Sequence, residues 1–195
     1  MSNTYKSNDP FSTDYQEPKI NNNGGNYTKL EAGDTELLIL GNAISGYEYW
    51  TKPDEENKYG KPVRFREDEQ IDISRLAEFR DDRGKVFFSM VVYNFNCNKI
   101  QIFRTTIKSI KNSLKAISTN KRLKRPQDYI ITITKTITDA SDPKNTTIYS
   151  LMQTVEQEVP LAVASVFDEL ALDLSLIYEN KDPFEDKLNP IISLE

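Results

Sequence analysis

The stretch Lys85-Val-Phe-Phe-Ser-Met-Val-Val-Tyr-Asn-Phe95 is rich in β-branched and aromatic residues and predicts a long β-strand. A short turn, Asn96-Cys97-Asn98, separates it from a second β-rich run, Lys99-Ile-Gln-Ile-Phe-Arg104. Together the two runs predict a β-hairpin whose faces are both largely apolar or aromatic. We expect one face to fill a core, whereas the other offers aromatic rings to a ligand.

After this hairpin the spacing of the apolar residues changes. Between Thr105 and Ser118 they recur three and four positions apart, which predicts an amphipathic helix with lysines on the neighbouring face. Residues 129–137 and 147–152 are again β-rich, and a polar loop joins them. This part of the sequence therefore predicts a helix followed by a second hairpin.

The region before the first hairpin supplies further strands. Residues 35–50 form a long β-rich run that Gly41 and Gly46 interrupt, which predicts a strongly curved strand with close backbone approaches. Residues 62–66 alternate between apolar and arginine side chains, and residues 70–81 fit a short surface helix. The predicted fold is mainly β: an OB-fold-like five-stranded barrel with an inserted amphipathic helix and a C-terminal helix.

The chain divides into four predicted parts. Residues 1–25 are rich in Asn, Ser, Asp and Pro and predict a disordered N-terminal arm. Residues 26–157 are predicted to form the OB-like domain, and residues 158–178 a C-terminal helix that either closes the barrel or pairs subunits. Residues 179–195 are expected to be an acidic flexible tail.

Charge is segregated along the chain. Residues 85–135 carry eleven basic side chains and one acidic side chain, a net charge of +10, although the whole protein is at −5. Residues 156–195, in contrast, have a net charge of −8. A basic, aromatic centre with an acidic appendage is the pattern expected of a nucleic-acid-binding protein.

Several classes of function are disfavoured by composition. The chain has no histidine, one cysteine and few glycines, which excludes histidine-assisted hydrolases and the usual Cys/His zinc site. We therefore expect no enzyme and no cofactor or metal. A carboxylate-metal nuclease using pairs such as Asp81 and Asp82 is a remote alternative, because the acidic residues lie in charged surface runs. The sequence has neither a long apolar span nor a secretory signal, so we expect a cytoplasmic protein without membrane contact.

A group of short motifs resembles one known family. The motifs are Gly46-Tyr-Glu-Tyr-Trp50, Lys61-Pro-Val-Arg-Phe-Arg66, the strand ending at Phe95, Lys99-Ile-Gln-Ile-Phe103, Thr106-Ile-Lys-Ser-Ile110 and the closing segment from Leu172 to Asp182-Pro-Phe184. In order and spacing they are similar to the single-stranded DNA-binding proteins of tailed bacteriophages and prophages. The resemblance implies an OB fold, sequence-independent binding of single-stranded DNA and a role in phage DNA replication or recombination.

The candidate nucleic-acid contacts are aromatic rings that stack bases and cations that hold phosphates. They are Tyr47, Tyr49, Trp50, Arg64, Arg66, Phe88, Tyr93, Phe95, Lys99, Arg104, Lys108, Lys111, Lys115, Lys121, Arg122, Lys124 and Arg125. Trp50, the only tryptophan, is the ring we most expect to stack on a base. The cations of residues 121–125 lack balancing acids in the sequence, which favours an anionic ligand there.

The tail has two possible roles. Its residues Asp182, Phe184, Glu185 and Asp186 either confer solubility or bind replication and recombination partners, with Phe184 as the apolar anchor. In the second case the tail folds back on the basic surface of residues 85–135 until DNA displaces it. The alternative to a DNA-binding protein is a phage structural or assembly protein whose β-domain contacts other subunits. A homo-oligomer is compatible with either function.

Overall fold

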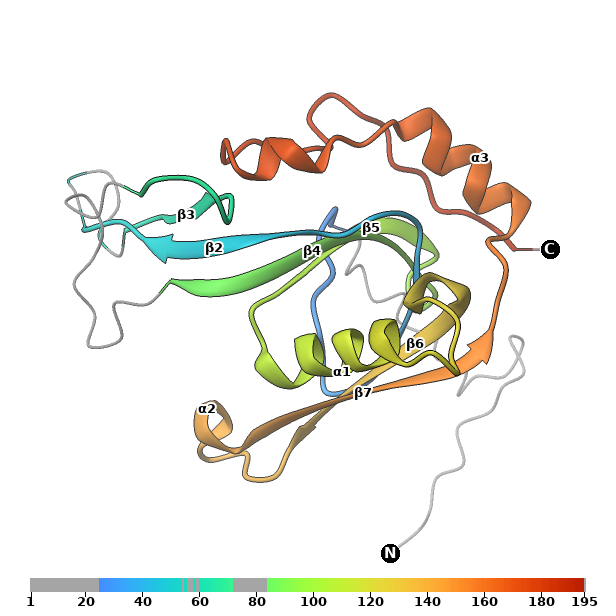
Figure 1. The fold of residues 1–195 in the computed structure, drawn as a ribbon, viewed down its shortest axis with the longest axis horizontal. Helices are drawn as coiled ribbons and strands as arrows, with labels where there is room; N and C mark the ends of the chain where they lie inside the picture. Colours follow the sequence, from blue (N-terminus) through green and yellow to red (C-terminus); the bar gives the residue numbers. More distant parts are fainter. Residues whose placement is uncertain (1–24, 54, 56–57, 59, 72–83, 195) are drawn as a thin grey trace, which may run out of the picture.

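The computed structural model describes residues 25–53, 55, 58, 60–71 and 84–194, and its architecture is mainly β (Figure 1). The strands are β1 (Gly33–Ile39), β2 (Ile44–Trp50), β3 (Pro62–Phe65), β4 (Lys85–Asn94), β5 (Lys99–Thr105), β6 (Tyr129–Ile137) and β7 (Thr147–Glu156). The helices are α1 (Lys108–Thr119), the single turn α2 (Pro143–Thr146) and α3 (Leu161–Leu170), with 3₁₀ turns at Pro126–Asp128 and Leu174–Ile177.

Seven strands form one antiparallel sheet in the order β3-β2-β4-β1-β6-β7, with β5 on the other edge of β4. Both predicted hairpins are confirmed: β4 pairs with β5, and β6 pairs with β7. The predicted five-stranded barrel is wrong, because the described strands number seven and form an open sheet. The β-dominated class is correct.

The predicted curved first strand consists of two strands in succession. β1 and β2 both pair with β4, β1 near Asn94 and β2 near Lys85, and residues 40–43 form a break between them. Within β2 a Cβ atom on Gly46 would lie 2.2 Å from the carbonyl oxygen of Phe65. Only glycine fits there, which confirms the predicted close backbone approach.

Helix α1 covers one face of the sheet, and its amphipathic pattern explains why. Ile110, Leu114 and Ile117 are the buried residues of the helix, as the sequence predicted. They pack in one core cluster with sheet residues such as Met90 and Val92 of β4. This face of the sheet is called the α1 side below.

The C-terminal part of the chain covers the opposite face (Figure 1). Its second core cluster joins Val91 and Tyr93 of β4 to Val163 of α3, Phe184 and Ile192. The central hairpin is therefore enclosed between two layers. The expectation that one whole face of this hairpin is open to a ligand is wrong, because residues far along the chain supply the second cover.

The C-terminal helix is shorter than predicted. It ends at Leu170, and Ala171 adopts a left-handed conformation with φ of 42° before the 3₁₀ turn. The prediction of a flexible tail is also wrong for residues 179–194. Phe184 is 3% exposed, and the Ile192 amide donates a 2.8 Å hydrogen bond to the Asn98 carbonyl oxygen.

Two predicted segments lie mostly outside the residues that the structure describes. Of the predicted N-terminal arm, only Gly25 is described. The predicted surface helix of 70–81 lies outside the described residues from residue 72 onward. Among the helices that the structure describes, none has the length and apolar character needed to cross a membrane.

Candidate nucleic-acid interface

The sheet divides the predicted contact residues between its two faces. Successive residues of a strand point to opposite sides, and paired residues on adjacent strands share a side. Phe88 therefore points to the α1 side, whereas Tyr93 points to the side that the C-terminal segment covers.

On the α1 side, two lysines lie over an aromatic ring. The Nζ atom of Lys115 is 5.4 Å from the centroid of the Phe88 ring, and that of Lys111 is 5.9 Å from it. Phe88 belongs to β4 and is half-buried, and the lysines lie one turn apart on α1. Lys111 also donates a hydrogen bond to the carbonyl oxygen of Val86. The helix thus places two cations against one ring of the sheet.

Three further rings continue this side of the sheet beyond α1. Ser45 pairs with Phe88, and Tyr47 pairs with both Val86 and Phe65, so the alternate residues Tyr47 and Tyr49 share the side of Phe88. The ring centroids of Tyr47 and Tyr49 are 6.5 Å apart, and those of Tyr49 and Phe65 are 5.9 Å apart. All three rings are half-buried.

We call the group of Tyr47, Tyr49, Phe65, Phe88, Lys111 and Lys115 the lysine–aromatic face. Five of its members are candidates from the sequence, and the structure brings them to one side of one sheet. Phe65 was missed as a contact. Its alternation with Arg64 placed it on an apolar face, and only the pairing of β3 with β2 brings it beside Tyr49.

The charge of this face is unbalanced locally. No carboxylate of the described residues lies within 4 Å of the Lys111 or Lys115 amine. Burial lowers the pKa of Lys111, and the neighbouring charge of Lys115 lowers it further. An anion at this position would relieve both effects, since it favours the charged form of each amine.

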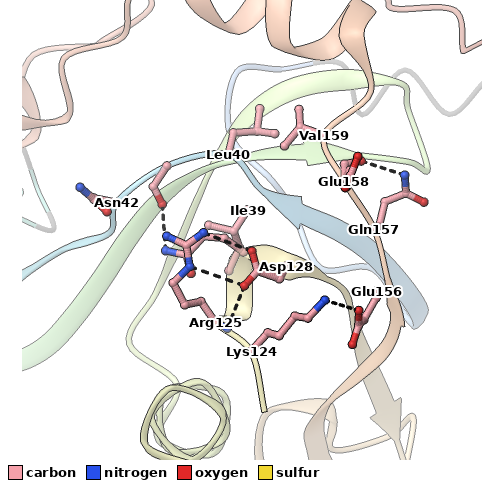
Figure 2. Close-up of a pocket in the computed structure, with 12 residues that line it drawn as sticks. Ile39, Leu40, Asn42, Lys124, Arg125, Asp128, Glu156, Gln157, Glu158 and Val159 are labelled. Atoms are coloured by element: carbon pink, nitrogen blue, oxygen red, sulfur yellow. Dashed lines mark hydrogen bonds and ion pairs between the residues drawn. The ribbon is translucent and has the colours of Figure 1, made fainter. Parts of the chain in front are cut away.

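The basic loop of residues 120–125 is partly neutralised, contrary to the prediction. Lys124 forms a 2.5 Å ion pair with Glu156 of β7, and Arg125 forms a 3.2 Å pair with Asp128 (Figure 2). The pKa of Lys124 is raised by the hydrogen bond to Glu156, and that of Asp128 is lowered by the hydrogen bond from Arg125. The acids were missed because Glu156 is distant in the sequence and Asp128 follows the loop.

A cavity of about 660 Å³ adjoins this loop (Figure 2). The cations that line it, Lys124 and Arg125, are outnumbered by Asp128, Glu156 and Glu158. It therefore does not suit a polyanion. Lys121 and Arg122 of the same loop are exposed, and no carboxylate in the described part of the chain lies within 4 Å of them.

Arg64 lies on the opposite side of the sheet and is 8% exposed. Its Nε donates a 3.0 Å hydrogen bond to Glu48, and its Nη1 donates a 3.2 Å bond to the Asn180 side chain. Arg104 lies 3.8 Å from the same Glu48 carboxylate, and burial lowers the pKa of Arg104. The prediction that Arg64 is an open phosphate contact is wrong, because a carboxylate and the C-terminal segment occupy its donors.

Tyr27 links the C-terminal segment to Arg104. The Tyr27 hydroxyl donates a 3.3 Å hydrogen bond to Asp182, and its ring lies 5.8 Å below the Arg104 guanidinium. Burial raises the pKa of Tyr27, and the charge of Asp182 raises it further. The tail therefore packs on the side opposite to Lys111 and Lys115 and does not cover them.

Arg66 also lies on the C-terminal side, 5.2 Å from the centroid of the Tyr178 ring. The Tyr178 hydroxyl donates a 2.6 Å hydrogen bond to the Ser45 carbonyl oxygen. A cavity of about 430 Å³ next to Arg66 is lined by Asp68, Glu69 and Glu179. Arg66 is exposed, but its surroundings are acidic.

The prediction that Tyr93 stacks on a base is wrong. It is fully buried, and its hydroxyl donates to Asn98 at 3.1 Å and to the Ile192 carbonyl oxygen at 3.3 Å. Phe95 packs edge-on against Tyr93 at 4.9 Å between centroids, also on the C-terminal side.

The remaining candidates lie apart from Phe88. Trp50 is 43% exposed at the far end of β2 and shares the side of Glu48 by alternation. Lys99 is at the start of β5 opposite Asn94, and Lys108 is exposed at the first position of α1. In the tail, Glu185 and Asp186 are exposed, whereas the burial of Phe184 removes it as a partner anchor.

Comparison of the chain with models of known families, with curated proteins and with solved structures gives no match. Within the described residues, no three His, Cys, Asp or Glu side chains form a group that suits a metal ion.

Proposed function

We propose that the protein binds single-stranded DNA without sequence preference and without catalysis, through the lysine–aromatic face. Bases stack on the half-buried rings, and phosphates pair with the lysines of α1. Such a protein protects single strands during DNA replication and recombination, and the bacteriophage setting follows from the sequence resemblance. Replication or recombination proteins bind the exposed carboxylates of the tail, such as Glu185 and Asp186, rather than the buried Phe184.

One observation carries this proposal: Lys111 and Lys115 both lie within 6 Å of the Phe88 ring, and no carboxylate of the described residues lies within 4 Å of either amine. A nucleotide offers the two groups that this arrangement lacks, a planar base for the ring and a phosphate for the lysines. Base–aromatic stacking contributes about 1–3 kcal/mol per base and tolerates any sequence.

The preference for a single strand follows from the same geometry. The rings lie in the surface of a sheet and beside a helix, so a base must present its flat face to reach them. Bases in a duplex are stacked on one another and hide those faces. A duplex would reach the lysines but not the rings.

We also propose that the curved sheet is a partly open variant of the OB fold rather than the closed five-stranded barrel. Support comes from the bent β1–β2 pair along one edge of β4 and from α1, which packs against the sheet after β5. OB folds bind single strands on the face of such a curved sheet.

A role in assembly is the second candidate, and one surface favours it. On β7, Ile148 is 58% exposed and Met152 is 60% exposed, and both point away from the α1 side. Their neighbours on the same side, Ser150 and Thr154, are uncharged. Depletion of charge is typical of the centre of a protein interface.

A salt-dependent titration of labelled dT oligonucleotides by fluorescence anisotropy tests the proposal. The logarithm of the affinity should fall linearly with the logarithm of the salt concentration, with a slope near −0.7 per phosphate neutralised. Binding that is independent of salt, or equal for duplex and single strands, overturns it. Large assemblies free of nucleic acid would instead support the assembly role.

A further inference from the structure

A small cavity of about 250 Å³ opens beside Phe88 on the α1 side of the sheet. It lies between the C-terminal half of α1 and the break in the bent strand, and Lys115 and Ser118 of α1 line it together with Ala43 of the break. Its other walls include Met90 and Leu114, so the interior is mainly apolar with one amine at the edge.

We propose that this cavity takes one unpaired nucleobase of the bound strand, a step that rests on the proposed function. The volume is below the range of about 300–1,000 Å³ that drug-sized ligands occupy, which favours a single planar ring system. Phe88 offers that base an aromatic surface, and Met90 and Leu114 offer it apolar contact. The other rings of the face then stack the neighbouring bases.

The charge around the cavity favours a nucleotide over a neutral apolar ligand. A base inserted here carries its phosphate at the rim, beside Lys115 and within a helical turn of Lys111. A neutral ligand would leave both amines without an anion, and burial already lowers the pKa of Lys111. The phosphate supplies the complementary charge.

The neighbouring cavity sets the direction of the strand. It shares Ile39 and Gln127 with the small cavity but is bordered by Glu156 and Glu158. The two cations at that border, Lys124 and Arg125, already pair with Glu156 and Asp128, so a phosphate gains little there. The backbone therefore leaves the cavity along α1 toward Lys111 and the rings of Tyr47 and Phe65.

Two substitutions fill the cavity from its rim without touching the core. Ala43 and Ser118 are both exposed, and Ala43→Phe and Ser118→Phe each place a ring in the space of the base. Ala162→Phe is the matched control, because Ala162 is exposed on α3, on the other side of the sheet. Each variant is titrated with a dT oligonucleotide and with an abasic deoxyribose-phosphate oligonucleotide of equal length.

The wild type should bind dT more tightly than the abasic oligonucleotide. Each filled variant should lose about fivefold to 150-fold in dT affinity, the range for one stacked base, and keep its abasic affinity. If the filled variants bind dT as the wild type does, the cavity is not a base site although the proposed function stands. If the wild type binds neither oligonucleotide, the proposed function itself fails.

Discussion

The amine of Lys115 lies 5.4 Å from the centroid of the Phe88 ring, which joins the exposed side of α1 to the centre of the sheet. Neither residue is distinctive alone, since lysines are common on exposed helix faces and phenylalanines in strands. Their contact brings a cation and a ring within reach of one nucleotide. Lys111, at 5.9 Å from the same ring, adds a second cation.

Replacement of Phe88 separates stacking from fold stability. Phe88→Leu should lower the affinity for a dT oligonucleotide by about fivefold to 150-fold, because leucine keeps apolar bulk but offers no ring. Phe95→Leu is the matched control, since Phe95 is also half-buried but packs on the opposite side. Equal losses for the two variants in anisotropy titrations would show that stacking at Phe88 is not the cause.

The two lysines should account for part of the salt dependence. Lys111→Gln combined with Lys115→Gln should reduce the magnitude of the slope by about 1.4, at about 0.7 for each phosphate contact removed from a single strand. Lys181→Gln should leave the slope unchanged, because Lys181 pairs with Glu179 on the C-terminal segment. The slope is read from affinities at several salt concentrations, and an unchanged slope in the double variant argues against phosphate contact on α1.

The lowered pKa of Lys111 predicts a pH dependence in two quantities. Burial is the main cause, so Lys111 releases its proton at a lower pH in the folded free protein than in the unfolded chain, where its pKa is near 10.5. Between the lowered pKa and 10.5 the unfolded state binds more protons, and the Lys111 contribution to stability rises with pH. DNA affinity moves the other way, because the phosphate needs the charged amine.

The affinity ratio of wild type to Lys111→Gln measures this effect. It should decline as pH rises through the lowered pKa, before ordinary lysines titrate. If the affinity ratio stays constant up to pH 10.5, the charged Lys111 amine does not contact the DNA.

The tail should act in folding rather than in partner binding at Phe184. Phe184→Ala should lower the free energy of unfolding by about 3–5 kcal/mol, since this ring is 3% exposed in the core on the C-terminal side. Leu188→Ala should have little effect, because Leu188 is 88% exposed. Denaturant titration compares the two variants. A Phe184→Ala protein as stable as the wild type would contradict a core position for this ring.

Local periodicity predicted the parts of the fold that depend on nearby residues. The spacing of Ile110, Leu114 and Ile117 was sufficient for α1, and the β-rich runs around Asn96 to Asn98 were sufficient for the β4–β5 hairpin. These elements are determined within a few residues of each other, so the sequence pattern carries the information.

The features that the sequence did not reveal depend on long-range pairing. Glu48 meets Arg64 because β2 pairs with β3, and Glu156 meets Lys124 because β7 returns to the loop. In the same way, Tyr93 is buried because Ile192 closes over it. A one-dimensional pattern of charge and hydrophobicity contains none of these contacts.

A tryptophan reporter placed on either side of the sheet tests most directly where DNA binds. In a Trp50→Phe background, Phe88→Trp puts the only tryptophan on the lysine–aromatic face, and Phe95→Trp puts it on the opposite side. Addition of oligo-dT should quench the emission of the first reporter and leave the second unchanged. Quenching of the reporter at position 95 alone would contradict binding on the lysine–aromatic face.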